Sequence, residues 1–192
     1  MNGRTLMSYG LSFALLALAR AAAAQDAPMH DGSWLIGGSA ALTRSHVDVN
    51  NSTTTHAALD PTGLYFINSH LAVGGTINLG YDEFPNGHAT TYGIGPAIRV
   101  YPSSSGAWQP FVAASFTPEW QTIVEPSPPD ATSTLYGLEG SLGLTRMLAS
   151  HVGLDGALFY NHQRGTSKRA ASSASFNENN YGLRFGLSVF VH

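Results

Sequence analysis

Apolar and polar residues alternate along the segment LAVGGTINLGY, residues 71–81. The odd positions are apolar apart from one glycine, and the even positions hold small or polar residues such as Thr76 and Asn78. Because successive side chains of a β-strand point to opposite faces, this pattern predicts a strand with one apolar face and one small, polar face. The question it raises is which face meets the solvent, and whether that solvent is water or lipid.

The same alternation recurs along the chain and predicts an all-β fold of eight strands. Each predicted strand has about 9–11 residues, the length with which a tilted strand crosses a bilayer. No segment after the N-terminal region has a persuasive helical period. The apolar positions of the eight segments run over residues 34–42, 59–65, 71–81, 92–100, 110–116, 136–144, 152–160 and 183–191.

The connections between these segments alternate in length. Residues 68–70, 102–107 and 149–151 are short turns, whereas residues 44–53, 83–89, 121–133 and 164–179 are long connections. We expect surface loops in the last two, because EPSPPDATS is rich in proline and RGTSKRAASSASFNENN is small and polar. Short turns at one end and long loops at the other are typical of an antiparallel, up-and-down transmembrane β-barrel with its long loops outside the cell.

A weak repeat supports this strand count. The motif Tyr-Gly-aliphatic starts at Tyr92, Tyr136 and Tyr181, so the spacings are 44 and 45 residues. This is the length of one strand–turn–strand–loop unit. Coincidence in a chain rich in glycine and tyrosine is the alternative explanation.

Composition favours lipid over water around the apolar face. Charged residues make up only 11% of the chain, against roughly 25% in a typical soluble protein. Lys168 is the single lysine, and the formal net charge of −3 does not suggest a nucleic-acid surface. The alternative is a soluble barrel such as a lipocalin, which points its apolar residues inward.

Aromatic residues and charged residues fall on opposite faces of the predicted strands. Aromatic residues at the ends of the apolar face predict two belts at the two membrane interfaces: Tyr81, Tyr92, Trp120, Tyr136, Tyr160 and Tyr181 near the long loops, and Trp34, Tyr65 and Trp108 near the short turns or the N-terminus. Charged residues on the opposite face predict a polar cluster in the lumen: Asp60, Arg99, Glu119, Glu139, Asp155 and Arg184. We expect Arg99 and Arg184 to bridge several of these carboxylates, with water or protonation covering the remainder, because unpaired buried charge is costly. We interpret the cluster as structural, and a transport or catalytic role is the alternative.

Four prolines conflict with the simplest strand pattern. Pro61, Pro96, Pro110 and Pro118 lie inside or near predicted strands on the outward face. Proline lacks the backbone N–H that a strand ladder uses, so we expect bulges or strand ends there.

The N-terminus predicts export. Arg4, the apolar run from Leu11 to Ala19 and the small residues Ala22–Ala24 are typical of a signal peptide over residues 1–24. A membrane-anchoring helix is the alternative, and it needs about 20 apolar residues. Residues 25–32 are expected to form a short periplasmic segment, and residues 33–192 the outer-membrane barrel. The chain has no cysteine, so no disulfide supports the fold.

Four segments resemble the small outer-membrane β-barrel domain family of Gram-negative bacteria. They are LDPTGLYFINSHLAVGGTINLGY, TTYGIGPAIRVY, WQPFVAAS and YGLRFGLSVFV. This resemblance covers most of residues 33–191. It implies an eight-stranded antiparallel barrel that the outer-membrane assembly machinery inserts by reading the last strand. His192 departs from the family pattern, since members usually end in an aromatic residue.

Catalytic and metal-binding motifs are not found in the sequence. The eight histidines show no metal-ligand spacing, and no phosphate-binding loop or nucleophile elbow is present, so no cofactor and no metal is expected. His162 invites comparison with lipid A acyl hydrolases, but these carry a serine two residues after the histidine, where this chain has Arg164. Without that hydroxyl the histidine has nothing to activate.

The sequence therefore predicts a non-enzymatic, monomeric barrel in the bacterial outer membrane, in contact with lipid and lipopolysaccharide and not with nucleic acid. The expected role is structural, or a surface interaction through extracellular loops. The first alternative is a small conduit for apolar compounds with a lateral gap in its wall, and the second is a lipid A acyl hydrolase. An open diffusion pore is not expected, because side chains fill so narrow a barrel.

Overall fold

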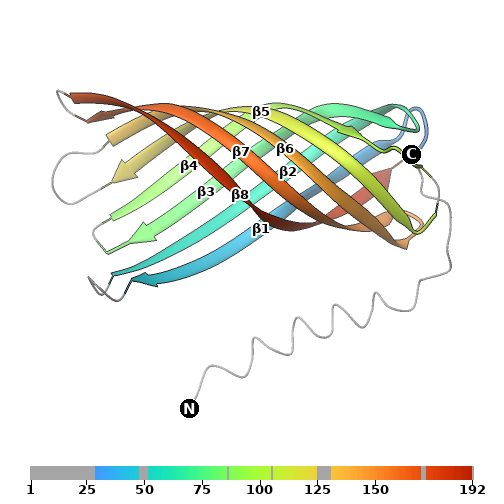
Figure 1. The fold of residues 1–192 in the computed structure, drawn as a ribbon, viewed down its shortest axis with the longest axis horizontal. Coiled ribbons are helices and arrows are strands. Elements are labelled where there is room, and N and C mark those ends of the chain that lie inside the picture. The colour runs from blue at the N-terminus through green and yellow to red at the C-terminus, as the bar shows by residue number, and fades with distance from the viewer. Residues whose placement is uncertain are drawn as a thin grey trace, which may run out of the picture.

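Eight antiparallel strands form a closed barrel and follow one another around the wall in sequence order (Figure 1). The computed structural model describes residues 29–47, 52–85, 87–104, 106–124, 131–169 and 172–191. The strands are β1 (Trp34–Val47), β2 (Ser52–Asn68), β3 (Leu71–Phe84), β4 (Gly87–Val100), β5 (Trp108–Val124), β6 (Ala131–Ala149), β7 (Val152–Arg169) and β8 (Ser172–Val191). The predicted eight-stranded up-and-down barrel is confirmed.

The N-terminal predictions are only partly covered by the structure. Residues 1–24, the predicted signal peptide, and residues 25–28 lie outside the described residues, as does His192. Among the residues that are described, no helix is long and apolar enough to cross a membrane.

The strands are longer than the sequence pattern predicts. They have 14 to 20 residues, as in β1 and β8, and they continue through much of what we expected to be loops. The hairpin of β7 and β8, for example, stays paired as far as Arg169 and Ser172. The polar residues 164–169 and 172–179 are thus strand, not loop. The apolar alternation marks only the lipid-facing part of a strand, whereas ladder hydrogen bonds extend it without apolar side chains.

The apolar face of the strands lies on the outside of the barrel. Ile77 is 40% exposed, Leu142 61% and Leu183 68%. Across the wall, Thr76 and Glu119 are buried. This is the reverse of a soluble barrel, and it leaves lipid as the medium that the exterior suits.

Three of the four prolines lie where a ladder is interrupted, and the strand register on either side is unchanged, so the expected bulges are not found there. Pairing of β2 with β3 is missing between Leu59↔Leu79 and Thr62↔Thr76, the stretch that holds Pro61. Pairing of β4 with β5 is missing between Gly93↔Glu119 and Ala97↔Ser115, and Pro96 and Pro118 both lie in that stretch. Because proline has no backbone N–H, the ladder loses hydrogen bonds near it, while the paired residues on either side keep the two strands in register. Pro110 lies within a continuous ladder opposite Leu144.

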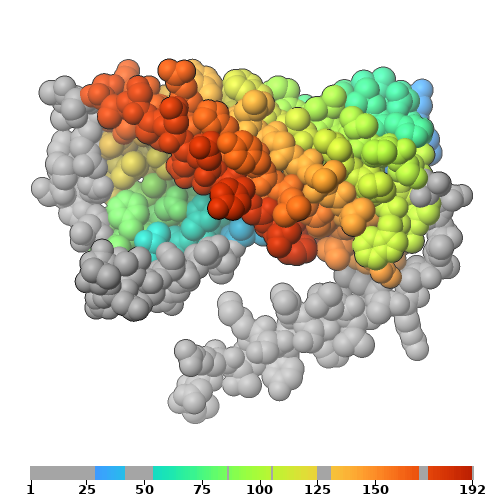
Figure 2. All heavy atoms as spheres, in the orientation of Figure 1, coloured from blue at the N-terminus to red at the C-terminus, as the bar shows by residue number. Residues whose placement is uncertain are grey.

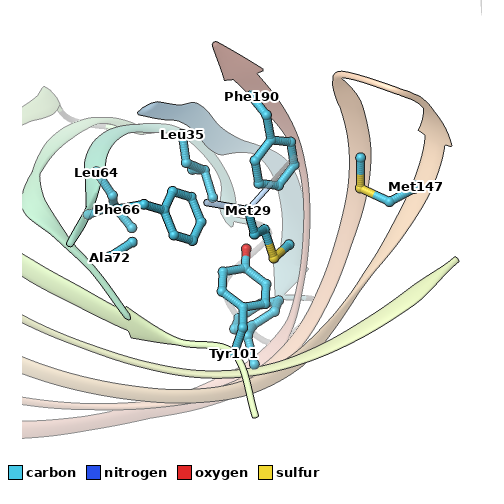
Figure 3. Close-up of a cluster of buried hydrophobic side chains, with 9 residues drawn as sticks. Met29, Leu35, Leu64, Phe66, Ala72, Tyr101, Met147 and Phe190 are labelled. Atoms are coloured by element: carbon cyan, nitrogen blue, oxygen red, sulfur yellow. The ribbon is translucent and has the colours of Figure 1, made fainter. Parts of the chain in front are cut away.

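An apolar plug fills the short-turn end of the lumen (Figure 3). Phe66 contacts two other rings of the plug, with centroid distances of 5.9 Å to Tyr101 and 6.2 Å to Phe190. The chain before β1 covers the end of the barrel, because Gly32 N donates to Phe66 O and Phe66 N donates to Ser33 O. The plug comprises Met29, Leu35, Leu64, Phe66, Ala72, Tyr101, Phe111, Met147 and Phe190.

Candidate functional site

A cavity of about 100 Å³ lies inside the barrel, beyond the plug. All eight strands contribute side chains to its lining. A cavity needs only ~10–15 Å³ to hold one water, so this one has room for several waters or a small chemical group. The structure places all six charged residues that the sequence assigns to the lumen in this one lining: Asp60, Arg99, Glu119, Glu139, Asp155 and Arg184.

Next to the plug, Arg99 and Asp155 form an ion pair. Arg99 Nη1 donates to Asp155 Oδ2 over 2.9 Å, and Thr145 and Ser188 each donate a hydroxyl to the same carboxylate over 2.6 Å. The guanidinium also lies over the Phe111 ring, 4.3 Å from its centroid. Asp155 thus has a cation and two hydroxyl donors, as a buried charge requires.

Farther from the plug, Arg184 holds Glu139 in a two-pronged ion pair with distances of 2.6 and 2.8 Å. Asp60 lies nearby and accepts a hydrogen bond from Ser39 over 3.2 Å. Among the described residues, Arg99 and Arg184 thus form one ion pair each, so that the two arginines reach two of the four carboxylates in the cluster. The two carboxylates without a guanidinium partner are Asp60 and Glu119.

Glu119 is the most distinctive group of the cavity, because it is 4% exposed and its hydrogen-bond partners are amides. Asn78 Nδ2 donates to Oε1 over 2.9 Å, and Gln163 Nε2 donates to Oε2 over 3.1 Å. Asn161, which also lines the cavity, has a buried Oδ1 with no hydrogen-bond partner. The sequence analysis did not assign these three amides to the polar cluster, because it selected that cluster by charge.

The Tyr-Gly repeat explains the space around Glu119. Tyr92 and Tyr136 are exposed on the outside, and the glycine after each lies at a position whose side chain would face the lumen. A Cβ on Gly93 would come within 2.6 Å of Glu119 Cγ. A Cβ on Gly137 would lie 3.4 Å from Asn161 Oδ1 and 3.6 Å from Glu119 Oε1. The repeat therefore marks positions at which an outward tyrosine is combined with room inside the barrel.

The wall between β1 and β8 is only partly closed. Within the described residues their pairing runs from Trp34↔Val191 to Ser39↔Gly186 and ends there. We call the remaining, mutually unpaired edges of β1 (residues 40–47) and β8 (residues 172–185) the open seam. Figure 2 shows the red atoms of β8 on the exterior of the barrel.

The open seam begins at the cavity and lies partly in the lipid-facing zone. Ser39 and Gly186, the last pair before the seam, both line the cavity. The apolar exterior of β8 extends from Val191 to Tyr181, so its outer part, including Phe185 and Leu183, lies beside the seam. The sequence analysis named a lateral gap only as an alternative and did not place it, because the alternation in β1 and β8 continues past the last pair.

The nine aromatic residues assigned to belts are all exposed on the exterior, between 38% and 82%. Trp34 contacts Tyr65 edge to face at 5.3 Å between ring centroids, and Tyr92 stacks on Trp120 at 5.5 Å. Their position at membrane interfaces stays a prediction.

His162 has a polar partner across the β7–β8 hairpin. Its Nδ1 lies 2.7 Å from Asn179 Oδ1, which also accepts a hydrogen bond from the Tyr160 hydroxyl over 2.9 Å. Among the residues that the structure describes, no group of three His, Asp or Glu side chains has a geometry that could hold a metal ion.

Comparison with solved structures supports the fold assignment. The outer membrane protein OprG from Pseudomonas aeruginosa is similar, with a TM-score of 0.54, 15% sequence identity, and coverage of 87% of this chain and 100% of that one. Neisserial surface protein A (NspA) has a TM-score of 0.51 and 17% identity, with 83% and 97% covered. The outer membrane protein AlkL, solved in DMPC bilayers, has a TM-score of 0.54 and 13% identity, with 87% and 93% covered.

No family model and no curated protein matches the chain, so the assignment depends on the fold and on the exterior. The three similar structures are outer membrane or surface proteins by name, and the barrel exposes large apolar side chains around its wall. On these grounds the chain has the fold of the small eight-stranded β-barrels of the bacterial outer membrane, with an apolar exterior that suits lipid.

Proposed function

We propose that this barrel is not an enzyme and that it passes small compounds with apolar parts between its extracellular mouth and the outer leaflet of the membrane. The observation that carries this proposal is the end of β1–β8 pairing at Ser39↔Gly186, two residues that also line the cavity. At this level the lumen and the lipid-facing side of the wall adjoin each other.

The apolar plug supports a sideways route rather than a route through the barrel. Phe66, Tyr101 and Phe190 are each at most 1% exposed and close the short-turn end. A compound in the cavity therefore finds packed side chains toward the periplasm and the open seam toward the lipid. Unpaired backbone groups are costly in hydrocarbon, so water from the cavity is expected to hydrate these edges.

A reversible cross-link tests this route. The chain has no cysteine, so Ala40→Cys with Phe185→Cys, one step beyond the last pair, forms a disulfide that draws the seam closed. Oxidation is expected to abolish protein-dependent entry of an apolar, lipid-sensitive fluorophore into cells, and reduction to restore it. The matched control is Ile36→Cys with Val189→Cys, a pair in the closed part of the same interface, where oxidation leaves entry unchanged. Equal entry through both oxidised variants would overturn the proposal.

Planar-bilayer recording separates this lateral route from a pore. A lumen closed by the plug gives no steady, large conductance, because ions find no continuous water path. Steady large openings of the wild-type protein would contradict the lateral route.

A surface-interaction role is the second candidate, and one observation favours it. β8 continues beyond Tyr181 with exposed polar residues, and β7 extends to the exposed Lys168 beside it. At about 3.3 Å per residue and a tilt near 40°, eight further residues project roughly 20 Å past the apolar band. Arg164 and Lys168 on this hairpin have the charge to attract lipopolysaccharide phosphates.

A shortened hairpin tests the surface role. Replacement of residues 167–174 by Asn-Gly removes the tip at a paired position, since Thr166 lies opposite Ser175. Loss of lipopolysaccharide binding with an unchanged gel shift between folded and boiled protein would support this role. Unchanged binding would exclude the tip of the hairpin as the binding site. Recognition of the last strand by the assembly machinery and the monomeric state also remain proposals.

A further inference from the structure

We propose that the cavity holds the head group of an amphiphile with a primary amine, and that the apolar tail of this molecule leaves through the open seam. The inference rests on the proposed lateral route and deepens it by naming the class of compound. It is carried by the cavity charges, an unsatisfied acceptor, and the junction of the cavity with the seam.

The cavity lining has an excess of negative charge. It contains four carboxylates and two guanidiniums, and the two ion pairs Arg99–Asp155 and Arg184–Glu139 account for both cations. Asp60 and Glu119 remain without a positive charge in direct contact. Glu119 is buried whereas Asp60 is only partly so, and a buried charge is costly unless a counter-charge compensates it. The cavity therefore favours a cationic guest beside Glu119.

The hydrogen-bonding groups around Glu119 require a donor. Asn161 Oδ1 is buried without a partner, and each carboxylate oxygen of Glu119, which accepts one amide N–H, has capacity for another. Both side chains border the space above Gly137. A primary ammonium brings three N–H donors and a positive charge to this space. A quaternary ammonium brings the charge without donors, and an alcohol brings a donor without the charge.

The size and position of the cavity decide where the tail goes. A volume of about 100 Å³ admits a head group but not a long alkyl chain as well. Ser39 and Gly186, at the start of the open seam, border the same space. The tail therefore points from the cavity toward Leu183 and Phe185, whose side chains are on the lipid side.

The test compares four amphiphiles of equal chain length on the full barrel in lipid nanodiscs. Dodecylamine is expected to shift the backbone amide NMR signals of Gly93 and Gly137 in a saturable way. Dodecyltrimethylammonium, dodecanol and dodecyl sulfate are expected to shift them at least about tenfold more weakly, because charge-assisted hydrogen bonds are roughly twice as strong as neutral ones.

Two variants of the cavity and one control make the test specific. Glu119→Gln removes the charge and keeps the shape, so it should weaken dodecylamine binding about tenfold or more. Gly137→Ala places a methyl group between the two acceptors at ordinary contact distances and should weaken binding without any change of charge. Glu83→Gln makes the same chemical change at an exposed position outside the lumen and should leave binding unchanged. The gel shift between folded and boiled protein confirms that each variant folds.

The outcomes separate this inference from the lateral route. If all four amphiphiles shift the cavity signals equally and the Ala40–Phe185 disulfide blocks them all, the amine preference is wrong and the lateral route stands. If dodecylamine alone binds but the oxidised protein binds it equally well, the head-group site stands and the path through the seam is wrong. If none of the four amphiphiles shifts these signals, both proposals are overturned.

Discussion

The short-turn half of the lumen is packed with apolar side chains around Phe66, whereas the long-loop half encloses a cavity with more carboxylates than cations. The wall changes at the same level. Beside the packed half, β1 pairs with β8 from Trp34↔Val191 to Ser39↔Gly186, and beyond it the two strands separate. The comparison shows that the apolar packing of the lumen and the β1–β8 pairing are concentrated in the same half of the barrel.

The two ion pairs follow the same division. The pair nearer the plug has side-chain exposures of 15% for Arg99 and 11% for Asp155, against 32% for Arg184 and 16% for Glu139. Water in the cavity can reach the second pair more easily. Substitutions in the packed half, or on one face of a strand, can therefore be compared with matched substitutions in the other half or on the other face.

The largest expected effect is in the plug. Phe66→Ala should lower the free energy of unfolding by about 3–5 kcal/mol, because it leaves a void among buried aromatic rings. Phe185→Ala, at a side chain that is 65% exposed to the lipid side, should cost much less, since lipid fills the space. Urea titration in lipid vesicles measures both values, and equal losses would contradict the division between the two halves.

The next comparison concerns the arginines. Arg99→Met should cost about 3–5 kcal/mol, because it leaves Asp155 buried without its cation. Arg184→Met should cost less, since the pair of Arg184 with Glu139 is more exposed than the pair of Arg99 with Asp155. The same unfolding titration applies, and a larger loss for Arg184→Met would reverse the ranking.

The face assignment predicts an effect of intermediate size. Ile77→Arg places a charge on the lipid side and should cost about 2–4 kcal/mol near mid-depth. Thr76→Arg, at the neighbouring buried position facing the lumen, should not show this depth-dependent penalty, although crowding against Thr62 has a cost of its own. Refolding yields in bilayers of different thickness distinguish the two, and identical tolerance would overturn the face assignment.

The smallest effect is expected outside the barrel at the short-turn end. Arg146 lies over the exposed Trp108 ring, 4.8 Å from its centroid. Arg146→Gln should therefore change the free energy of unfolding by less than about 1 kcal/mol. A loss comparable to that of Arg99→Met would show that the exterior contact matters as much as the buried one.

Much of the fold could be predicted from the alternation of residues. Positions such as Ile77 and Leu142 point outward as the pattern requires, and the charged positions line the lumen. The strand ends could not be predicted, because β7 and β8 extend through serine- and asparagine-rich residues with no apolar alternation. The amides around Glu119 were missed for a similar reason, since neutral polar residues are common in strands and nothing local distinguishes them.

The sequence by itself determined the number of strands and the face that each turns to lipid, because side chains alternate with a period of two residues wherever a strand forms. Only the tertiary structure decided which charges pair, where Met29 and Tyr101 close the lumen, and where β1 leaves β8. These features join residues far apart in the chain, and closure of a barrel depends on the tilt and stagger of all its strands together.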